Sequence, residues 1–578
     1  MKNKLILLIA LLFTTSEYIV TFGSIYSKVG VLYPIEYKKI NGKLKVHSYL
    51  LTPIDKKSIV YIDGISEIFQ TTKRQDSLLI WLPLIGEKTN LKVVSGKNTI
   101  INQVVIPLIP SDWGYFQNGT IHLIQSSHQD IGWIDTPDYC RKERINDIII
   151  PALDIMKEDK DFTFEMEQTL NLMEFLEEHP ERKSEVIKRY SEKRFNWGAT
   201  FNQPYEGLES GEQLVRQVYY GRKWIMENLP GCDDRTAANV DVPGRTWQLP
   251  QIFAKSGIEN LLVSRMREGL YNWYAPDGSK LFTFTPGNYG WASLFWKFFE
   301  DDAVTAFQRL HHRSALWSDY FRTRKIPPHY AILMSCDGTK PKNYMPLIKE
   351  WNKIVEMAEI PLPKLVNSTA ESYFDCVNKK EALMERVEGE RPNLWLYIHG
   401  PAHYEAIKVK REAAILMPSA ETITALQGVM FKGLANYPRL RFDRAWMASI
   451  YPDHGWGGKN GVTTDSIFAD SLITARNIGR ILFNSSLQSL TNNINVPAKS
   501  IIVYNDLTWA RRDIAYIDIS NTDKNWLVKS NGEVIPSQIV EDCGVYKLAF
   551  LAKVPALGYN TYVVLGVKKD IKKLRNYK

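Results

Sequence analysis

The chain has 578 residues, a length that favours several domains over a single hydrophobic core. Its content of 44% hydrophobic and 24% charged residues is typical of folded proteins and argues against extended disorder. The formal net charge of +8 is partly carried by the basic first residues and by the lysine-rich stretch 568–575, so composition gives no support to nucleic-acid binding.

The first residues have the pattern of an export signal. Lys2 and Lys4 precede the apolar run 5–13, and polar residues follow it. The run is shorter than the roughly 20 residues that span a bilayer, and no later segment reaches that length without charged residues. We therefore expect a signal peptide at 1–22, no membrane span in the mature chain, and a secreted or periplasmic protein.

Residues 23–112 predict a small β module, because short β-branched runs alternate there with turn residues. From 113 to 378, short apolar strands alternate with longer helical stretches, which is typical of a parallel sheet covered by helices. The strands that we predict there are 121–124, 162–164, 237–240, 261–263 and 331–334. This pattern favours a parallel, barrel-like (β/α) domain, with its functional residues at the carboxyl ends of the strands.

Residues 379–492 predict a helical bundle whose last helix begins at a cap formed by Thr464 or Asp465. Strand-like runs return at 501–504, 515–519 and 561–564, and they predict a C-terminal β module at 493–578. The expected fold class is thus α/β plus all-β, in which small β-sandwich modules flank the (β/α) domain and the bundle. The five cysteines are too few and too widely spaced for a disulfide framework, so we expect most of them to be buried thiols.

The first candidate site follows the predicted strand 121–124. His128 and Asp130 are two residues apart in extended chain, so their side chains point to the same side. An imidazole and a carboxylate in this arrangement suit zinc. A hydrogen-bonded pair with a purely structural role is the alternative.

Two distant segments offer further ligands. Asp241 follows the predicted strand 237–240, where it could also cap a helix, and His454 lies in the glycine-rich loop 451–458, which could also be a plain connector. Because metal-capable residues recur where loops leave strands or helices, we predict that two His and two Asp surround one ion.

The order of these segments resembles the glycoside hydrolase family 38 alpha-mannosidases. The motif His-x-Asp-x-Gly-Trp at 128–133, the Asp241 strand end followed by Gly244, and the later loop with His454 carry the resemblance from about residue 120 onward. The family implies zinc bound by the four predicted ligands, Asp241 as the nucleophile as well, and Trp133 as a platform on which a sugar stacks. It also implies a mannose-containing glycan as substrate.

Two further residues fit the family pattern. Asp337 follows the predicted strand 331–334 and precedes Gly338, as the family acid/base does, although an Asp-Gly turn is the alternative. Arg265 follows the predicted strand 261–263 and resembles an arginine near the sugar, although a surface or ion-pairing role is the alternative. The resemblance implies a retaining mechanism, for which the carboxyl groups of Asp241 and Asp337 should lie about 5 to 5.5 Å apart.

The chain also departs from the family pattern. Val242, Pro243 and Gly244 follow Asp241 where an aromatic residue is usual, and one small β module follows the helical region where a large β-sandwich region is usual. We therefore expect a truncated C-terminal module. Two other functions stay open: a zinc-dependent polysaccharide deacetylase, which attacks with metal-bound water, and a noncatalytic glycan-binding protein. Neither the oligomeric state nor the natural glycan follows from the sequence.

Overall fold

A computed structural model of the chain describes residues 29–54, 57–70, 75–380, 382–391, 395, 398, 400–497, 500–520 and 524–568, and the predicted signal peptide lies outside them. Contacts divide the chain into two compact units. The first comprises the residues up to Ile398 together with Asp453–Thr464, and the second comprises His399–Pro452 and Asp465–Lys578. The predicted boundaries at 112 and 378 both fall inside the first unit.

The first unit begins with two antiparallel sheets. One contains β1 (Val29–Val31), β2 (Tyr37–Ile40), β3 (Lys43–Ile54) and β6 (Gln75–Pro83). The other contains β4 (Lys57–Ile62), β5 (Ile65–Gln70), β7 (Thr89–Ser95) and β8 (Asn98–Val105). Buried and exposed residues alternate along β7, as they do in a strand with one face on a core.

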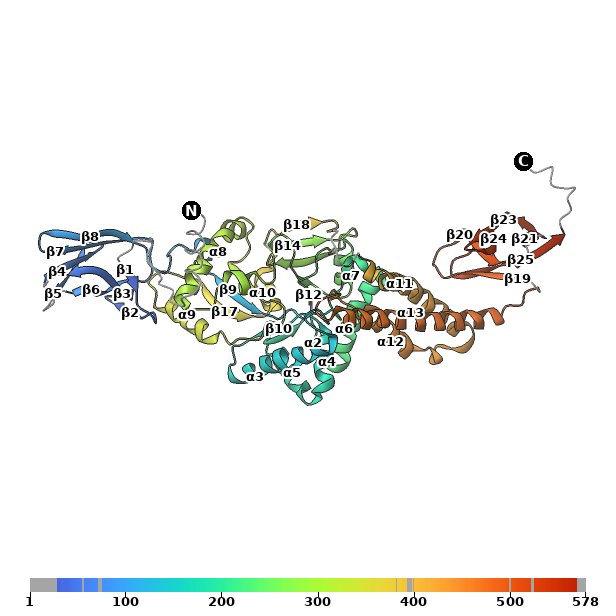
Figure 1. Ribbon diagram of the computed structural model, residues 1–578, viewed down its shortest axis with the longest axis horizontal. Coiled ribbons are helices and arrows are strands. Elements are labelled where there is room, and N and C mark those ends of the chain that lie inside the picture. The colour runs from blue at the N-terminus through green and yellow to red at the C-terminus, as the bar shows by residue number, and fades with distance from the viewer. Residues whose placement is uncertain are drawn as a thin grey trace, which may run out of the picture. The chain divides into compact units, whose positions relative to one another are not determined.

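Parallel strands follow, and they carry the candidate site (Figure 1). β9 (Thr120–Gln125) lies between β16 (His329–Met334) and β17 (Lys364–Ser368), and β10 (Phe164–Met166) pairs with β11 (Phe195–Trp197). A third sheet has the order β12 (Thr236–Asn239), β13 (Asn260–Val263), β15 (Lys280–Thr285), β14 (Gly269–Tyr274) and β18 (Glu385–Glu388).

A closed barrel is not shown for these strands among the described residues. They fall into separate sheets, with β10 linked to the β9 segment by an isolated bridge between Ser126 and Glu165, and with β14 antiparallel to β15. The strand predicted at 162–164 lies at 164–166. Strands β11, β14, β15 and β17 were not predicted, since their apolar runs are short or interrupted by polar residues.

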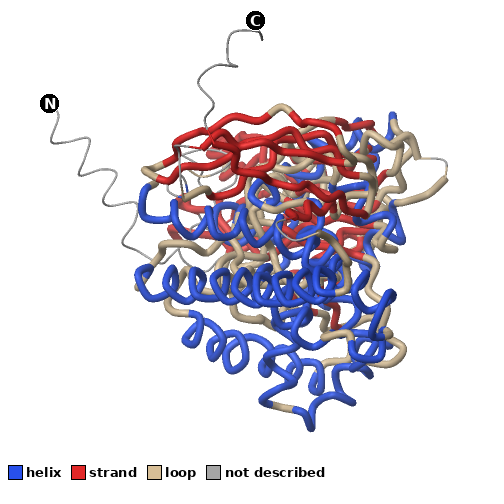
Figure 2. Tube along the Cα trace, turned by 90° about the vertical axis from the view of Figure 1, so that its right-hand side faces the viewer, coloured by secondary structure: helices blue, strands red, loops and turns tan. Residues whose placement is uncertain are grey.

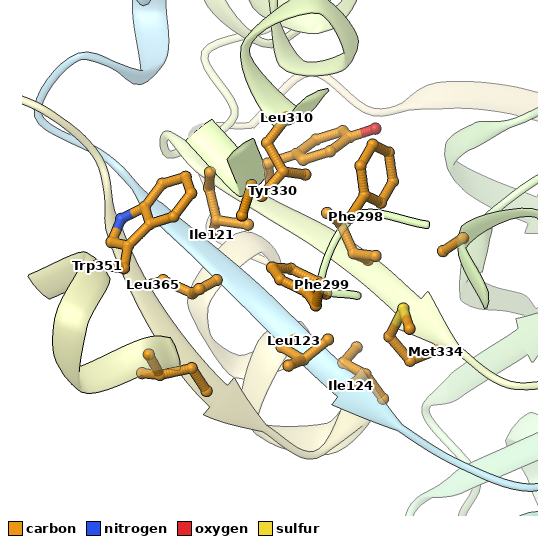
Figure 3. Packing of buried hydrophobic residues seen from close by; sticks show 14 of the residues in the cluster. Ile121, Leu123, Ile124, Phe298, Phe299, Leu310, Tyr330, Met334, Trp351 and Leu365 are labelled. Atoms are coloured by element: carbon orange, nitrogen blue, oxygen red, sulfur yellow. The ribbon is translucent and has the colours of Figure 1, made fainter. Parts of the chain in front are cut away.

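Helices and apolar side chains surround the parallel strands. The helices are α2 (Pro137–Glu143), α3 (Ile150–Glu158), α4 (Thr169–Glu178), α5 (Lys183–Ser191), α6 (Gly211–Asn228), α7 (Leu249–Lys255), α8 (Ala303–Thr323), α9 (Met345–Met357) and α10 (Ala370–Val377). Figure 3 shows Ile121, Leu123 and Ile124 of β9 among the neighbouring apolar side chains, and all three are fully buried. This packing fixes β9, the strand that leads into the candidate site.

The second unit holds helices α11 (Pro401–Gln427), α12 (Arg439–Ile450) and most of α13 (Gly461–Asn492), which are among the helices drawn in blue in Figure 2. The predicted cap of the last helix is wrong: α13 begins at Gly461. Asp465 lies within the helix, where its carboxylate accepts a hydrogen bond from His403 Nε2 at 2.9 Å. This ion-pair geometry gives Asp465 a tertiary partner in place of the backbone N–H groups that a capping residue would satisfy.

Antiparallel strands close the described chain in two sheets. One contains β19 (Ser500–Asn505), β21 (Lys524–Ser530), β22 (Glu533–Ile535) and β25 (Gly558–Lys568), and the other contains β20 (Arg511–Asp518), β23 (Ser537–Asp542) and β24 (Val545–Val554).

The helical stretch Pro401–Phe431 is long and apolar enough to cross a membrane, with a mean hydropathy of 1.2 in its most apolar window. Core helices of soluble proteins reach the same value, so this single stretch is weak evidence for a span.

Candidate metal centre and active site

The chain that leaves β9 runs between the carboxyl ends of two other parallel strands. Ser126 bridges to Glu165 within β10, and His128 bridges to Asp337 beyond the end of β16. The His128 amide donates to the carbonyl of Cys336 at 3.1 Å, and the Gly338 amide donates to the carbonyl of His128 at 3.0 Å. The backbone register therefore places Asp337 directly beside His128.

Three of the four predicted metal ligands form one buried cluster: His128, Asp130 and His454. The Nε2 atoms of the two histidines are 3.2 Å apart. Asp130 Oδ1 lies 2.8 Å from Nε2 of His454 and 3.5 Å from Nε2 of His128. Asp241, the fourth predicted ligand, comes next to the cluster, with Oδ2 at 4.0 Å from Nε2 of His454.

Each imidazole is oriented through its other ring nitrogen. His128 Nδ1 lies 2.7 Å from Glu167 Oε2, and His454 Nδ1 lies 2.6 Å from the backbone carbonyl of Gln203. A carbonyl oxygen only accepts hydrogen bonds, so Nδ1 of His454 carries the hydrogen. In the neutral ring, Nε2 then carries no hydrogen and its lone pair faces the cluster, as a metal ligand requires.

The charge of the cluster favours a cation. Burial opposes the protonation of His454, but the Asp130 carboxylate outweighs it and raises the pKa of His454 to about 9. Burial likewise opposes protonation of His128, whereas Glu167 and Asp130 raise its pKa well above the usual range. In turn, the two imidazoles hold the pKa of Asp130 below its ordinary value against the effect of burial. The carboxylates thus stabilise positive charge at this point, whether protons or a metal ion carry it.

The loop that carries His454 is fixed against the segment that carries Asp130. The buried Asp453 carboxylate accepts hydrogen bonds from the amides of Ile131 at 2.7 Å and Gly455 at 2.8 Å. Gly458 has a φ of +65°, and a Cβ there would meet the carbonyl oxygen of Trp133 at 2.4 Å, so only glycine fits this close approach. Trp133 itself keeps 37% of its surface exposed beside this loop.

Arg265 is exposed and forms an ion pair with Asp241. Its Nε donates to Asp241 Oδ1 at 3.0 Å, and its Nη2 forms a second, shorter contact with the same oxygen. The guanidinium also lies 5.5 Å from the ring centre of Tyr289 and 5.4 Å from that of Trp395. Arg265 therefore holds one oxygen of Asp241 and leaves Oδ2 turned toward His454.

Tyr289 joins Asp337 to this arrangement. Its hydroxyl donates to Asp337 Oδ1 at 2.5 Å, and its ring centre is 5.1 Å from that of His128. Burial, followed by the nearby charges of Asp241 and Asp337, raises the pKa of Tyr289, so its hydroxyl stays protonated and acts as a donor. Asp337 is itself exposed, which leaves its other oxygen accessible to a ligand.

Two family models match parts of this chain. Residues 118–396 match the model of the glycosyl hydrolases family 38 N-terminal domain, and residues 519–564 match the lysosomal alpha-mannosidase-like central domain. The first match covers just under half of the chain. Residues 118–396 thus carry the N-terminal domain of glycosyl hydrolase family 38. The resemblance predicted from the sequence motifs is thereby confirmed.

Individual relatives of this chain are distant. It is 23% identical to an alpha-mannosidase of Saccharomyces cerevisiae over 313 residues, which are 50% of this chain and 27% of the yeast protein. It is 35% identical to a lysosomal alpha-mannosidase of Dictyostelium discoideum over 81 residues, which are 14% of this chain and 8% of that protein. The chain thus spans about a quarter or less of the length of these relatives.

A solved structure supports the fold. The crystal structure of an alpha-mannosidase from Enterococcus faecalis V583 superposes with a TM-score of 0.56 at 16% identity, over 78% of this chain and 55% of that one. This similarity extends to the mixed α/β architecture with several sheets and helices.

The sequence did not single out several residues that build the candidate site. Glu167 orients His128, Gln203 orients His454, and Tyr289 contacts Asp337. Glu167 directly follows β10, so the rule that pointed to Asp241 and Asp337 at strand ends would have found it had the strand been placed at 164–166. Gln203 and Tyr289 lie in loops that carry no such signal.

Proposed function

We propose that this chain is a zinc-dependent, retaining alpha-mannosidase that hydrolyses mannosides in glycans outside the cytoplasm. The observation that carries the proposal is the meeting of His128, Asp130 and His454, with the Asp241 carboxylate 4.0 Å from His454. The names of the alpha-mannosidase relatives support the mannoside as substrate. The secreted or periplasmic location rests on the signal-like pattern at 1–22 alone.

The donor set fits zinc. Two imidazole nitrogens and carboxylate oxygens are ligands that zinc accepts in catalytic sites, and Oδ1 of Asp130 is buried without a hydrogen-bond partner. Oδ1 lies only 2.8 Å from His454 Nε2, although no hydrogen bond of acceptable geometry joins these two atoms. His128, Asp130 and His454 would hold the ion together with Asp241. A bound zinc ion would supply Lewis-acid contacts to the hydroxyl groups of the sugar.

The chain's own carboxylates would carry the reaction. Asp241, held by Arg265, would attack the anomeric carbon and form a covalent glycosyl-enzyme. Asp337 would protonate the departing glycosidic oxygen, while Tyr289 fixes the orientation of its carboxyl group. The same Asp337 would then take a proton from water as that water releases the sugar with retained configuration. Trp133, half exposed beside the loop, would stack on the sugar.

One set of assays separates this proposal from its rivals. The purified protein is incubated with an aryl alpha-mannoside and with an acetylated polysaccharide, each with zinc and with a chelator. An alpha-mannosidase releases the aryl group in the presence of zinc, and its first sugar product keeps the alpha configuration in the NMR spectrum. Acetate release without mannoside turnover would favour a deacetylase, and sugar binding without either product would favour a glycan-binding protein. Either result would overturn the proposal.

A further inference from the structure

A second cluster of metal-capable side chains lies near the opposite end of β9. His122 belongs to β9, His329 is the first residue of β16, and Cys376 belongs to α10. One donor atom from each lies within 4.8 Å of the other two. In the strand register, Thr120 pairs with His329 and Ala331 pairs with His122, so the two histidines are diagonal neighbours on one face of the sheet.

The contact between the imidazoles is short and buried. His122 Nε2 lies 2.8 Å from His329 Nδ1, and His122 is only 5% exposed. The second ring nitrogen of His122, Nδ1, is buried without a hydrogen-bond partner. A hydrogen bond between two neutral rings accounts for the 2.8 Å contact, but it does not account for a thiol placed beside both rings.

We propose that His122, His329 and Cys376 bind a second transition-metal ion, of which Zn²⁺ is the natural candidate. Two imidazoles and a thiolate are the ligand types that zinc and its borderline-soft neighbours prefer. Donors bound to one zinc ion at about 2.0 to 2.3 Å lie roughly 3 to 4 Å from one another, so small side-chain movements bring this cluster to that geometry. Three protein ligands leave a fourth position for water, on the side where His329 and Cys376 are half exposed.

Metal binding would couple to the loss of a proton. A thiol binds metal as the thiolate, so Cys376 would release its proton to solvent as the ion binds, and binding would weaken at low pH. An ion here would join β9, β16 and α10 and would be independent of the His128 cluster and of the function proposed for it.

The test is the metal content of the full chain. The protein is stripped with a chelator, reloaded with Zn²⁺ or Co²⁺, and freed of excess metal. Wild type is expected to bind two metal ions per chain. Cys376→Ser and His454→Ala are each expected to bind one. With Co²⁺, the thiolate-to-metal charge-transfer band should be present in wild type, in His454→Ala and in the control Cys232→Ser, which removes a buried thiol elsewhere in the chain, and absent in Cys376→Ser.

The outcome that overturns the inference is equally direct. If Cys376→Ser binds as much metal as wild type, or if the wild-type Co²⁺ protein lacks the thiolate band, there is no site at this cluster. Circular dichroism checks that each variant is folded, and His329→Gln, at a half-exposed position, provides a second variant that should also lose one equivalent. Loss of the second equivalent leaves the His128 cluster intact, so mannoside turnover reports separately on the proposed function.

Discussion

Strand β9 leads to one candidate metal cluster at its carboxyl end and contributes a residue to another near its amino end. The first, His128–Asp130–His454, draws its side chains from distant parts of the sequence, and both rings are oriented by hydrogen-bond acceptors, Glu167 and the Gln203 carbonyl. The second, His122–His329–Cys376, contains no carboxylate, and the second nitrogen of His122 has no partner. Hydrogen-bond acceptors and charged groups surround the first cluster, as a catalytic site requires. The second cluster has ligands that can hold an ion, but among the described residues no acceptor orients the second nitrogen of His122.

The largest effect is expected from Asp241→Asn. The amide cannot form the covalent glycosyl-enzyme, so kcat/KM for an aryl alpha-mannoside should fall about 10⁴-fold or more. The metal bound by the His122 cluster should stay unchanged, because Asp241 lies beside the other cluster, next to His454. Steady-state kinetics together with metal analysis check both statements. Turnover within tenfold of wild type would remove Asp241 from the mechanism.

Asp337→Asn should have the next largest effect. Loss of the general acid is expected to lower kcat/KM by about 10² to 10⁴ for substrates with poor leaving groups. Activated aryl mannosides need less protonation, so their first step should be affected much less. Comparing two leaving groups in the same variant measures this difference. An equal loss for both substrates would contradict an acid role and would leave the Asp-Gly turn as the better explanation of Asp337.

The orienting role of Glu167 can be measured against a matched control. Glu167→Gln should weaken zinc at the carboxyl-end cluster by about 10- to 100-fold, because the amide orients His128 less well and adds no charge. Glu165→Gln makes the same chemical change two residues earlier. The buried carboxyl group of Glu165 accepts a hydrogen bond from the Ala370 amide. Zinc competition with a chromophoric chelator should distinguish the two variants. Equal affinities would contradict the role of Glu167.

Glu165 also makes a prediction about pH. Burial raises its pKa from the ordinary 4.5 to about 8, so between these values the folded chain binds a proton that the unfolded chain has released. The free energy of unfolding should therefore decrease as the pH rises from about 4.5 to about 8, with this group contributing at most about 1.4 kcal/mol per pH unit. Glu165→Gln should flatten that decrease in urea titrations monitored by tryptophan fluorescence. An unchanged slope would mean that Glu165 is ionised in the fold.

The smallest effect is expected from Trp133. If its half-exposed ring stacks on a sugar, Trp133→Ala should raise KM about two- to twelvefold, the effect of about 0.5 to 1.5 kcal/mol of stacking. Trp133→Phe keeps an aromatic face and should restore most of the loss, whereas kcat should change little in either variant. A KM that is the same for the Ala and Phe variants would contradict stacking.

The sequence predicted the parts of the site that obey a local rule. Metal-capable residues that follow apolar strands, such as His128, Asp241 and Asp337, were found because parallel strands bring their carboxyl ends together. Tyr289 and Gln203 were missed since they lie in loops, where only tertiary packing decides which side chain points inward. His122 and His329 were missed for the converse reason: they lie within or at the start of strands, and pairing register alone brings them together.

The same limit applies to the fold. The apolar runs of β9, β12, β13 and β16 were visible in the sequence, whereas β11 and β17 are short strands whose existence depends on their neighbours.

The number of buried thiols predicted from the sequence was too high. Cys140 and Cys232 are buried, Cys336 and Cys376 are partly exposed, and Cys543 is exposed, because its position between two β-strands has a positive φ typical of a turn.

Zinc reconstitution of the Cys376→Ser protein tests the central claim most directly, because this variant should retain only the His128 cluster. Chelator-stripped protein is titrated with Zn²⁺ while aryl alpha-mannoside hydrolysis is followed. We predict that activity is absent without zinc, rises in proportion to bound zinc and reaches its plateau at one equivalent. Hydrolysis that persists in the stripped protein, or no hydrolysis at one bound equivalent, would contradict the account.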